Sequence, residues 1–276
     1  MSQDISDLYQ APGAGSSAYY STLFLDSERR RAVTSLLAIY AEMRRVVEKT
    51  EDANIARIKL AWWRNQLVAL TLGRPEHPAC LALLPFVAKF NLASNLLGEL
   101  VDGLEIDLMQ TRYLDFSALE RYCVLVGGSL SALVAGICGN REEDLAEYAR
   151  LLGVGVQMTT IIRDAGEHAR VGRIYLPVNE LKQFQVPAAD LLNARHSDAF
   201  ASLMEFQCDR ALSYFDAAAL ALPAKARKVQ RCGLILMAFH RALLKEIKAD
   251  GFHVLQHKVG LTPLRKFWLA WKTWVF

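Results

Sequence analysis

The chain has 276 residues, of which 53% are apolar and 22% are charged, so a packed core is expected and extensive disorder is excluded. The formal net charge is only +3, and no Lys/Arg cluster or nucleic-acid motif occurs, so nucleic acid is not expected as a partner. The five cysteines are widely spaced, and neither a signal peptide nor a membrane-spanning apolar run is recognisable, so we predict a cytoplasmic protein.

Apolar residues recur at helical spacing along nearly the whole chain, and the alternation typical of strands is almost absent. The first long helix carries Val33, Leu36 and Met43 on its apolar face, and Asp26 or Ser27 is its predicted N-cap. The pattern predicts one all-α domain covering 1–276. Its expected helices lie near 27–51, 53–72, 79–89, 92–110, 117–138, 142–168, 197–220, 224–250 and 262–275.

Two of these helices carry a polar stripe between strongly apolar faces. A polar stripe usually faces water, but these helices have little room for a solvent-facing side. Asp164, Glu167 and His168 are spaced to share one helix face and so suggest a metal site. The stripes consist of Gln157, Thr160, Asp164, Glu167 and His168 in one helix, and of Tyr40, Arg44, Glu48 and Glu51 in the other.

Each stripe ends in carboxylates beside arginine. Carboxylate oxygens are suitable ligands for Mg²⁺, and protein-bound Mg²⁺ often bridges to substrate phosphates. The guanidinium groups of Arg44, Arg163 and Arg173 can bind phosphate oxygens directly. The two stripes therefore predict a site that holds metal ions together with an anionic ligand.

Six segments together are highly specific for one family. They are GSSAYYSTLFL, KLAWWR, VDGLEIDL, RYCVLVGGSL, QMTTIIRDAGEHARVGRIYLP and RKFWLAW. On these segments the sequence resembles the squalene/phytoene synthase family of head-to-head prenyltransferases, and within it the bacterial presqualene diphosphate synthases. The resemblance implies a single-domain helical bundle of the isoprenoid-synthase type with a central cavity.

The resemblance also implies roles for individual residues. Members of this family bind Mg²⁺ and the diphosphates of two prenyl substrates, such as farnesyl diphosphate, between two acidic motifs. These motifs correspond to residues 47–51, the first acidic motif, and 164–168, the second acidic motif. The implied metal ligands are Glu48, Glu51, Asp164, Glu167 and His168; the implied catalytic residues are Tyr40, Tyr122 and Tyr175; and the implied substrate-binding residues are Ser16, Ser17, Arg44, Thr160, Arg163 and Arg173.

Both motifs depart from the family pattern. Val47 and His168 stand where the family has aspartates, Lys49 adds a positive charge, and Thr160 replaces an asparagine. A neutral imidazole is a poor ligand for Mg²⁺ and suits Zn²⁺ or Mn²⁺ better. We therefore predict that a prenyl diphosphate still binds, whereas Mg²⁺ binding and prenyl transfer are weakened or lost. Nothing in the sequence argues for NADPH.

Two other functions stay open. The protein is an active head-to-head transferase if Glu48, Glu51, Asp164 and Glu167 suffice for catalysis. Alternatively, it is a helical scaffold without a prenyl ligand or a non-catalytic assembly factor, as is one mitochondrial family member that assists respiratory complex I assembly. A product assay separates the first alternative from the other two.

Two further segments carry predictions. Asp102, Glu105 and Asp107 place three acids within two helical turns, either as a third metal-facing cluster or as capping and solvated acids. The C-terminal segment 262–276 combines tryptophans with lysine and arginine. This composition predicts an amphipathic helix at the inner face of the cytoplasmic membrane, with a helix docked on the core as the alternative.

Overall fold

The computed structural model describes residues 13, 15–50, 52–139 and 144–275. Within these ranges the regular structure is helical, apart from one isolated bridge between Arg112 and Ile174, so the predicted all-α fold is confirmed. The long helices are α2 (Ser27–Lys49), α3 (Ala53–Thr71), α4 (Pro78–Lys89), α5 (Ser94–Met109), α7 (Ser129–Cys138), α8 (Ala146–Arg163), α12 (Asp198–Ala221), α13 (Arg231–Ala249) and α14 (Pro263–Val275). The short helices are α1 (Ser17–Thr22), α6 (Phe116–Cys123), the π-helix η2 (Val124–Gly128), α9 (Ala165–Arg170), α10 (Val178–Gln183), α11 (Ala188–Leu192) and the 3₁₀ helix η3 (Ala224–Ala226).

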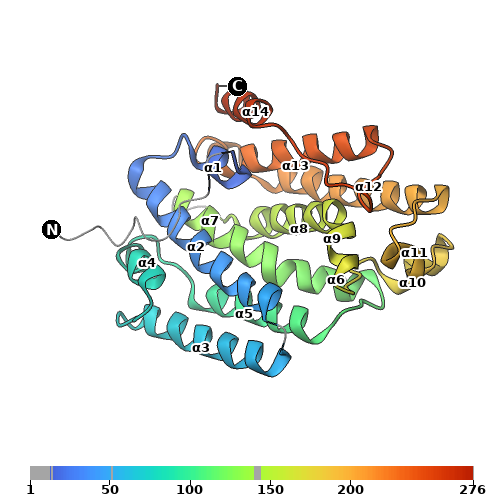
Figure 1. Ribbon diagram of the computed structural model, residues 1–276. Helices are drawn as coiled ribbons and strands as arrows, with labels where there is room; N and C mark the ends of the chain where they lie inside the picture. Colours follow the sequence, from blue (N-terminus) through green and yellow to red (C-terminus); the bar gives the residue numbers. More distant parts are fainter. Residues whose placement is uncertain (1–12, 14, 51, 140–143, 276) are drawn as a thin grey trace.

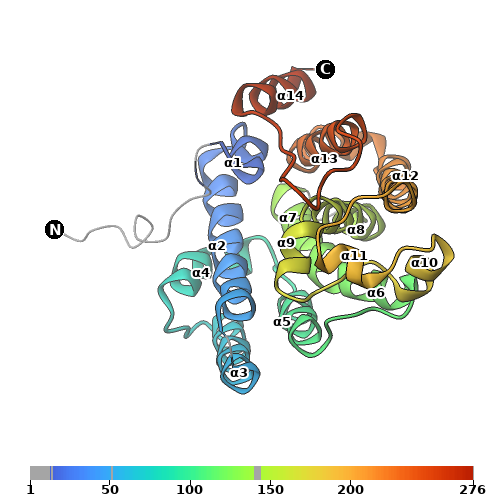
Figure 2. The ribbon, with the colours of Figure 1, turned by 45° about the vertical axis from the view of Figure 1, so that its right-hand side comes forward.

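The helices form two large apolar cores, both of which pack against Tyr40, and a small cluster of Ile235, Phe239 and Ala270 joins α13 to α14. One core is built mainly from α2 to α5 and α7, and includes Leu36, Leu60 and Leu83. The other is built mainly from α6 and α8 to α13, and includes Met158 and Phe200. Figures 1 and 2 show α2 to α4 on one side of the bundle, α8, α12 and α13 on the other, and α14 outside α1 and α13.

The start of α2 follows from local chemistry. Asp26 is the N-cap, as predicted, because its carboxylate accepts the backbone N–H groups of Glu28 and Arg29 at 3.1 and 2.9 Å. Val33, Leu36 and Met43 then bury one face of the helix. Tyr40 and Arg44 of the first stripe line a pocket between the helices.

The predicted helix at 117–138 is interrupted by the π-helix η2. The interruption lies where η2 packs directly on α8: a Cβ atom added to Gly127 would lie 2.3 Å from the carbonyl oxygen of Gly153. Only glycine permits this backbone contact. By length and composition the stretch Phe116–Cys138 could cross a membrane, but 56% of its apolar window is buried inside the molecule. It therefore forms part of the core.

The predicted helix at 142–168 is also divided. It forms α8 and α9, which are separated at Asp164, where φ is −96° and ψ is 13°. The predicted helix at 224–250 becomes η3 followed by α13, which begins at Arg231. The short helices α1, α10 and α11 were not predicted, because five or six residues are too few to show a helical period.

Candidate functional site

An apolar pocket of about 270 Å³ lies between the two sides of the bundle. Helices α1, α2, η2, α7, α8 and α13 contribute to its walls. Leu37 and Val126 are among its apolar side chains, and Tyr40, Arg44 and Thr160 belong to its polar lining. The pocket thus combines a long apolar wall with a few groups that can orient a polar end.

A second pocket, of about 280 Å³, is basic. Arg163, Lys258 and Lys266 line it, together with Ser17 and His240. Ser17 lines both pockets, so the two spaces adjoin at the start of α1. Along α8, Thr160 lines the apolar pocket and Arg163, one turn later, lines the basic one.

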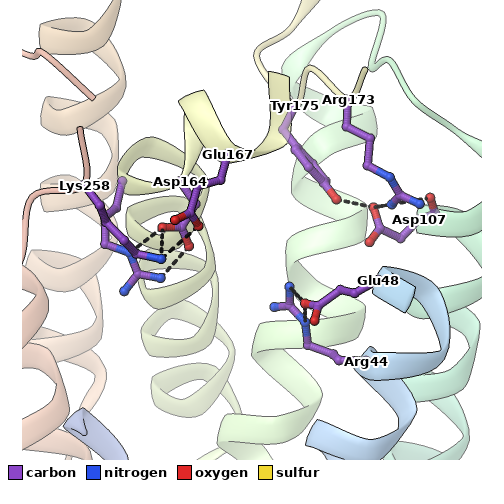
Figure 3. Close-up of polar contacts among 9 residues, drawn as sticks. Arg44, Glu48, Asp107, Asp164, Glu167, Arg173, Tyr175 and Lys258 are labelled. Atoms are coloured by element: carbon purple, nitrogen blue, oxygen red, sulfur yellow. Dashed lines mark hydrogen bonds and ion pairs between the residues drawn. The ribbon is translucent and has the colours of Figure 1, made fainter. Parts of the chain in front are cut away.

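The carboxylates of the second acidic motif lie against Lys258 (Figure 3). The Nζ atom of Lys258 is 3.2 Å from Asp164 Oδ1 and 2.8 Å from Glu167 Oε2. Arg163 also donates to both oxygens of Asp164, through Nε at 2.7 Å and through Nη2. Burial opposes ionisation of Asp164, but Arg163 and Lys258 outweigh it and hold the pKa of this carboxyl below its usual value.

The described part of the first acidic motif is also paired with a cation. Arg44 lies one turn before Glu48 on α2 and donates to its Oε1 atom through Nη2 at 2.7 Å and Nε at 3.1 Å. Figure 3 shows this pair across the site from Asp164 and Glu167. Val47, on α2, is buried in the apolar core, and Glu51 lies outside the described residues. Hence the position occupied by Val47 does not face either pocket.

Asp107 is the one acid of segment 102–107 that joins the site, although the sequence did not separate it from Asp102 and Glu105. It is buried, it accepts a hydrogen bond from the hydroxyl of Tyr175, and its Oδ1 atom lies 3.0 Å from Nη1 of Arg173. Burial raises the pKa of the Asp107 carboxyl, although Arg173 and Tyr175 oppose that shift. The helical period could have predicted that Asp107 is buried, because it shares a helix face with Leu104 and Leu100, which lie one and two turns earlier and are also buried.

The other two acids of that segment face away from the site. Asp102 and Glu105 form ion pairs with Arg64 of α3, at 2.7 and 3.1 Å, and their side chains are 48% and 34% exposed. The three acids therefore do not form one cluster. This outcome corrects the alternative in which all of them faced a metal ion.

The second stripe divides between two environments. Whereas Asp164 and Glu167 meet Lys258, the His168 ring packs on Tyr175 with 4.6 Å between centroids. Tyr122 packs on the same tyrosine at 5.6 Å. Burial lowers the pKa of His168 to about 4, so the imidazole is neutral near pH 7. Within the described structure, its buried Nδ1 atom has no hydrogen-bond partner.

This arrangement does not fit Mg²⁺. Among the described residues, no three His, Cys, Asp or Glu side chains are gathered to hold a metal ion. The carboxylates of Glu48, Asp164 and Glu167 instead contact arginine or lysine. Mg²⁺ requires near-octahedral oxygen coordination, and each of these contacts occupies oxygens that it would need. Asp164 and Glu167 contact Lys258 whereas His168 packs on Tyr175, and their shared role as metal ligands stays a prediction.

The predicted serines begin α1. The hydroxyl of Ser16 accepts the N–H of Tyr19 at 3.0 Å and so caps this helix, whereas Ser17 lines both pockets. The Thr160 hydroxyl donates back to the carbonyl of Val156 at 3.0 Å. Thr160 therefore presents a bonded hydroxyl to the pocket, and its oxygen retains acceptor capacity.

A family model described as Squalene/phytoene synthase matches residues 11–265. The chain belongs to the squalene/phytoene synthase family. It is 30% identical over 263 residues to a 15-cis-phytoene synthase of Synechococcus elongatus, covering 90% of this chain and 84% of the relative. It is 31% identical over 271 residues to a 15-cis-phytoene synthase of Synechocystis sp., covering 92% and 80%.

Solved structures show the same fold. A dehydrosqualene synthase crystallised with a ligand superimposes with a TM-score of 0.83 at 20% identity, covering 98% of this chain and 93% of that one. The squalene synthase HpnC from Alicyclobacillus acidocaldarius gives 0.75 at 22% identity, covering 85% and 88%. These similarities confirm the isoprenoid-synthase-type bundle that the sequence motifs implied.

Proposed function

We propose that the protein binds a prenyl diphosphate such as farnesyl diphosphate, and that its head-to-head transferase activity is weakened or lost. The observation that carries this proposal is the junction of an apolar pocket and a basic pocket at Ser17. A prenyl diphosphate has the matching chemistry, with an apolar chain joined to a compact, highly charged anion. The chain would occupy the apolar pocket, and the diphosphate would lie among Arg163, Lys258 and Lys266.

We expect weakened prenyl transfer because the carboxylates of the acidic motifs already contact arginine or lysine. Ionisation of an allylic diphosphate builds up negative charge on the leaving group, which cations placed against it must stabilise. Here Glu48, Asp164 and Glu167 are already engaged by side-chain cations. The relatives named as phytoene synthases favour the alternative, an active transferase.

Filling the apolar pocket should weaken binding of the prenyl chain but not of the diphosphate group. Leu37 lines this pocket, so Leu37→Trp should reduce affinity for farnesyl thiodiphosphate at least tenfold and change affinity for inorganic diphosphate less than about twofold. Isothermal titration calorimetry measures both. Leu220→Trp is the matched control, because Leu220 is 88% exposed on α12 and should affect neither ligand. A wild-type protein that binds neither compound would refute the proposed function.

The C-terminal helix α14 supports a second part of the proposal, association with an anionic membrane surface. One side of α14 docks on the bundle, with Ala270 buried and the Trp274 ring stacked on Phe24 at 5.2 Å between centroids. The other side leaves Leu264, Trp268 and Trp271 exposed by 78%, 51% and 45%. Indole rings beside cationic side chains are typical of membrane-interfacial helices.

Replacing the exposed apolar side of α14 should abolish membrane binding without removing the helix. The triple change Leu264→Ser, Trp268→Ser and Trp271→Ser should reduce the partition coefficient onto phosphatidylserine-containing liposomes at least tenfold in co-sedimentation, since each large apolar side chain contributes about 1.5–3 kcal/mol when buried. The matched control changes three exposed apolar residues of α3 and its C-cap to serine. Equal loss in both variants would exclude a specific role for α14. The control residues are Ile58, Trp62 and Leu72, with exposures of 70%, 44% and 61%.

A further inference from the structure

We propose that Lys258 takes the place of a divalent metal ion at the second acidic motif, so that the site binds a diphosphate group without added Mg²⁺. The inference deepens the proposed prenyl diphosphate function and rests on it. Members of the family bind a metal ion at this motif, but the side chains of this chain do not leave its carboxylate oxygens free for one. The carboxylates that would bind a metal ion are bound by protein cations instead.

Lys258 lies where it competes with a metal ion for oxygen. Its ammonium group bridges Asp164 and Glu167, one turn apart, at 3.2 and 2.8 Å. A Mg²⁺ ion coordinated by the same two residues would need those oxygens and would stand close to a fixed positive charge. Both effects oppose metal binding, since like charges repel more strongly at a partly buried site than in bulk water.

Packing positions the backbone that leads to Lys258. The segment before it passes directly over α9: a Cβ atom added to Gly166 would lie 2.5 Å from the carbonyl oxygen of Val254 and 2.8 Å from that of Leu255. Val254 and Leu255 are themselves buried in the core. A glycine in the middle of the second acidic motif thus allows the backbone that carries Lys258 to lie against that motif.

The sign of the local charge then favours an anion. Arg163, Lys258 and Lys266 line the basic pocket, and the nearby carboxylates are those of Asp164 and Glu167. These cations exceed the carboxylates by one charge, so the pocket attracts diphosphate as it stands. Without Lys258 the charges would balance, and the attraction would depend on an added cation.

The described part of the first acidic motif, across the site on α2, is paired with a cation in the same way. Arg44 engages Glu48 through two hydrogen bonds, at 2.7 and 3.1 Å, and lines the apolar pocket. A carboxylate of each acidic motif therefore has a protein cation already in contact with it. Glu48, Asp164 and Glu167 therefore rely on fixed side-chain cations instead of exchangeable metal ions.

The test measures affinity for farnesyl thiodiphosphate, which resists ionisation, by isothermal titration calorimetry in EDTA and in Mg²⁺. For the wild type, the two dissociation constants should differ less than threefold. Lys258→Met removes the charge and keeps the length of a side chain that is 49% exposed. This variant should bind at least tenfold more weakly in EDTA, and Mg²⁺ should restore affinity because the two carboxylates become free.

Two further variants make the result decisive. Lys258→Arg keeps the charge and should bind in EDTA within about threefold of the wild type. Lys248→Met is the matched control: this lysine also lies between two carboxylates, Asp209 at 2.6 Å and Glu205 at 3.8 Å, but lines neither pocket. It should leave both affinities unchanged.

The failures of the two proposals are distinguishable. Wild-type affinity at least tenfold higher in Mg²⁺ than in EDTA would overturn the role of Lys258 and leave prenyl diphosphate binding intact. Equal behaviour of Lys258→Met and Lys248→Met would also overturn that role. Absence of wild-type binding in both buffers would overturn the proposed function, and this inference with it.

Discussion

Wild-type protein incubated with farnesyl or geranylgeranyl diphosphate and Mg²⁺ should form head-to-head products at least about 10³-fold more slowly than an active relative. The expected products would be presqualene diphosphate, squalene or dehydrosqualene, and phytoene. Loss of a single preorganised electrostatic donor slows comparable charge-forming reactions by about 10²–10³-fold. In this chain Glu48, Asp164 and Glu167 each contact a side-chain cation.

The structural reason lies in what ionisation demands beyond binding. Binding requires only net attraction, which Arg163, Lys258 and Lys266 provide. Ionisation requires stabilisation that increases as charge moves onto the leaving group, and this depends on the placement of cations around it. The His168 ring packs on Tyr175, whereas Asp164 and Glu167 contact Lys258.

The measurement is mass detection of the extracted lipid products, with the Synechocystis 15-cis-phytoene synthase assayed in parallel as the positive control. Metal-free and Mn²⁺-containing reactions accompany the Mg²⁺ reaction. Conversion within tenfold of the relative would show that the carboxylates present suffice for transfer. The active-transferase alternative would then replace the weakened-activity proposal.

Replacing Asp107 by alanine should destabilise the fold by about 3–5 kcal/mol, the usual effect of removing one partner of a buried ion pair. The side chains of Asp107 and Arg173 are only 7% and 19% exposed. Without the carboxylate, the Arg173 guanidinium and the Tyr175 hydroxyl both lose their acceptor in a largely buried place. Urea unfolding at pH 7 measures the change in the free energy of unfolding.

Asp102→Ala is the matched control, because it removes an aspartate from the same helix. Asp102 pairs with Arg64 at 2.7 Å, but its side chain is 48% exposed, so the expected loss is below about 1 kcal/mol. The double variant Asp107→Leu with Arg173→Met should lose less than Asp107→Ala, since it leaves no unpaired charge. Similar losses for Asp107→Ala and Asp102→Ala would show that the buried cluster contributes little to stability.

The sequence by itself determined the helices that follow a clear apolar period and have a recognisable cap. Asp26 and the apolar face of α2 are examples, because a cap and a helix face depend only on residues a few positions apart. The family was also recognisable from segments spread over most of the chain, and the match to residues 11–265 confirms it. The breaks at η2 and at Asp164 were not predicted; both lie beside close backbone contacts with distant residues, at Gly127 and Gly166, which local spacing does not reveal.

Only the tertiary structure decided which charged residues meet. Lys258 is 91 residues from Glu167, and Asp107 is 68 residues from Tyr175, so no local spacing predicts either contact. The stripe pattern placed Asp164, Glu167 and His168 on one helix face. In the structure the segment before Lys258 packs over α9, so Lys258 contacts the two carboxylates. The imidazole of His168 packs against Tyr175 instead. Helical spacing fixes the direction of a side chain to within one turn, and the elements that pack against that turn determine its partner.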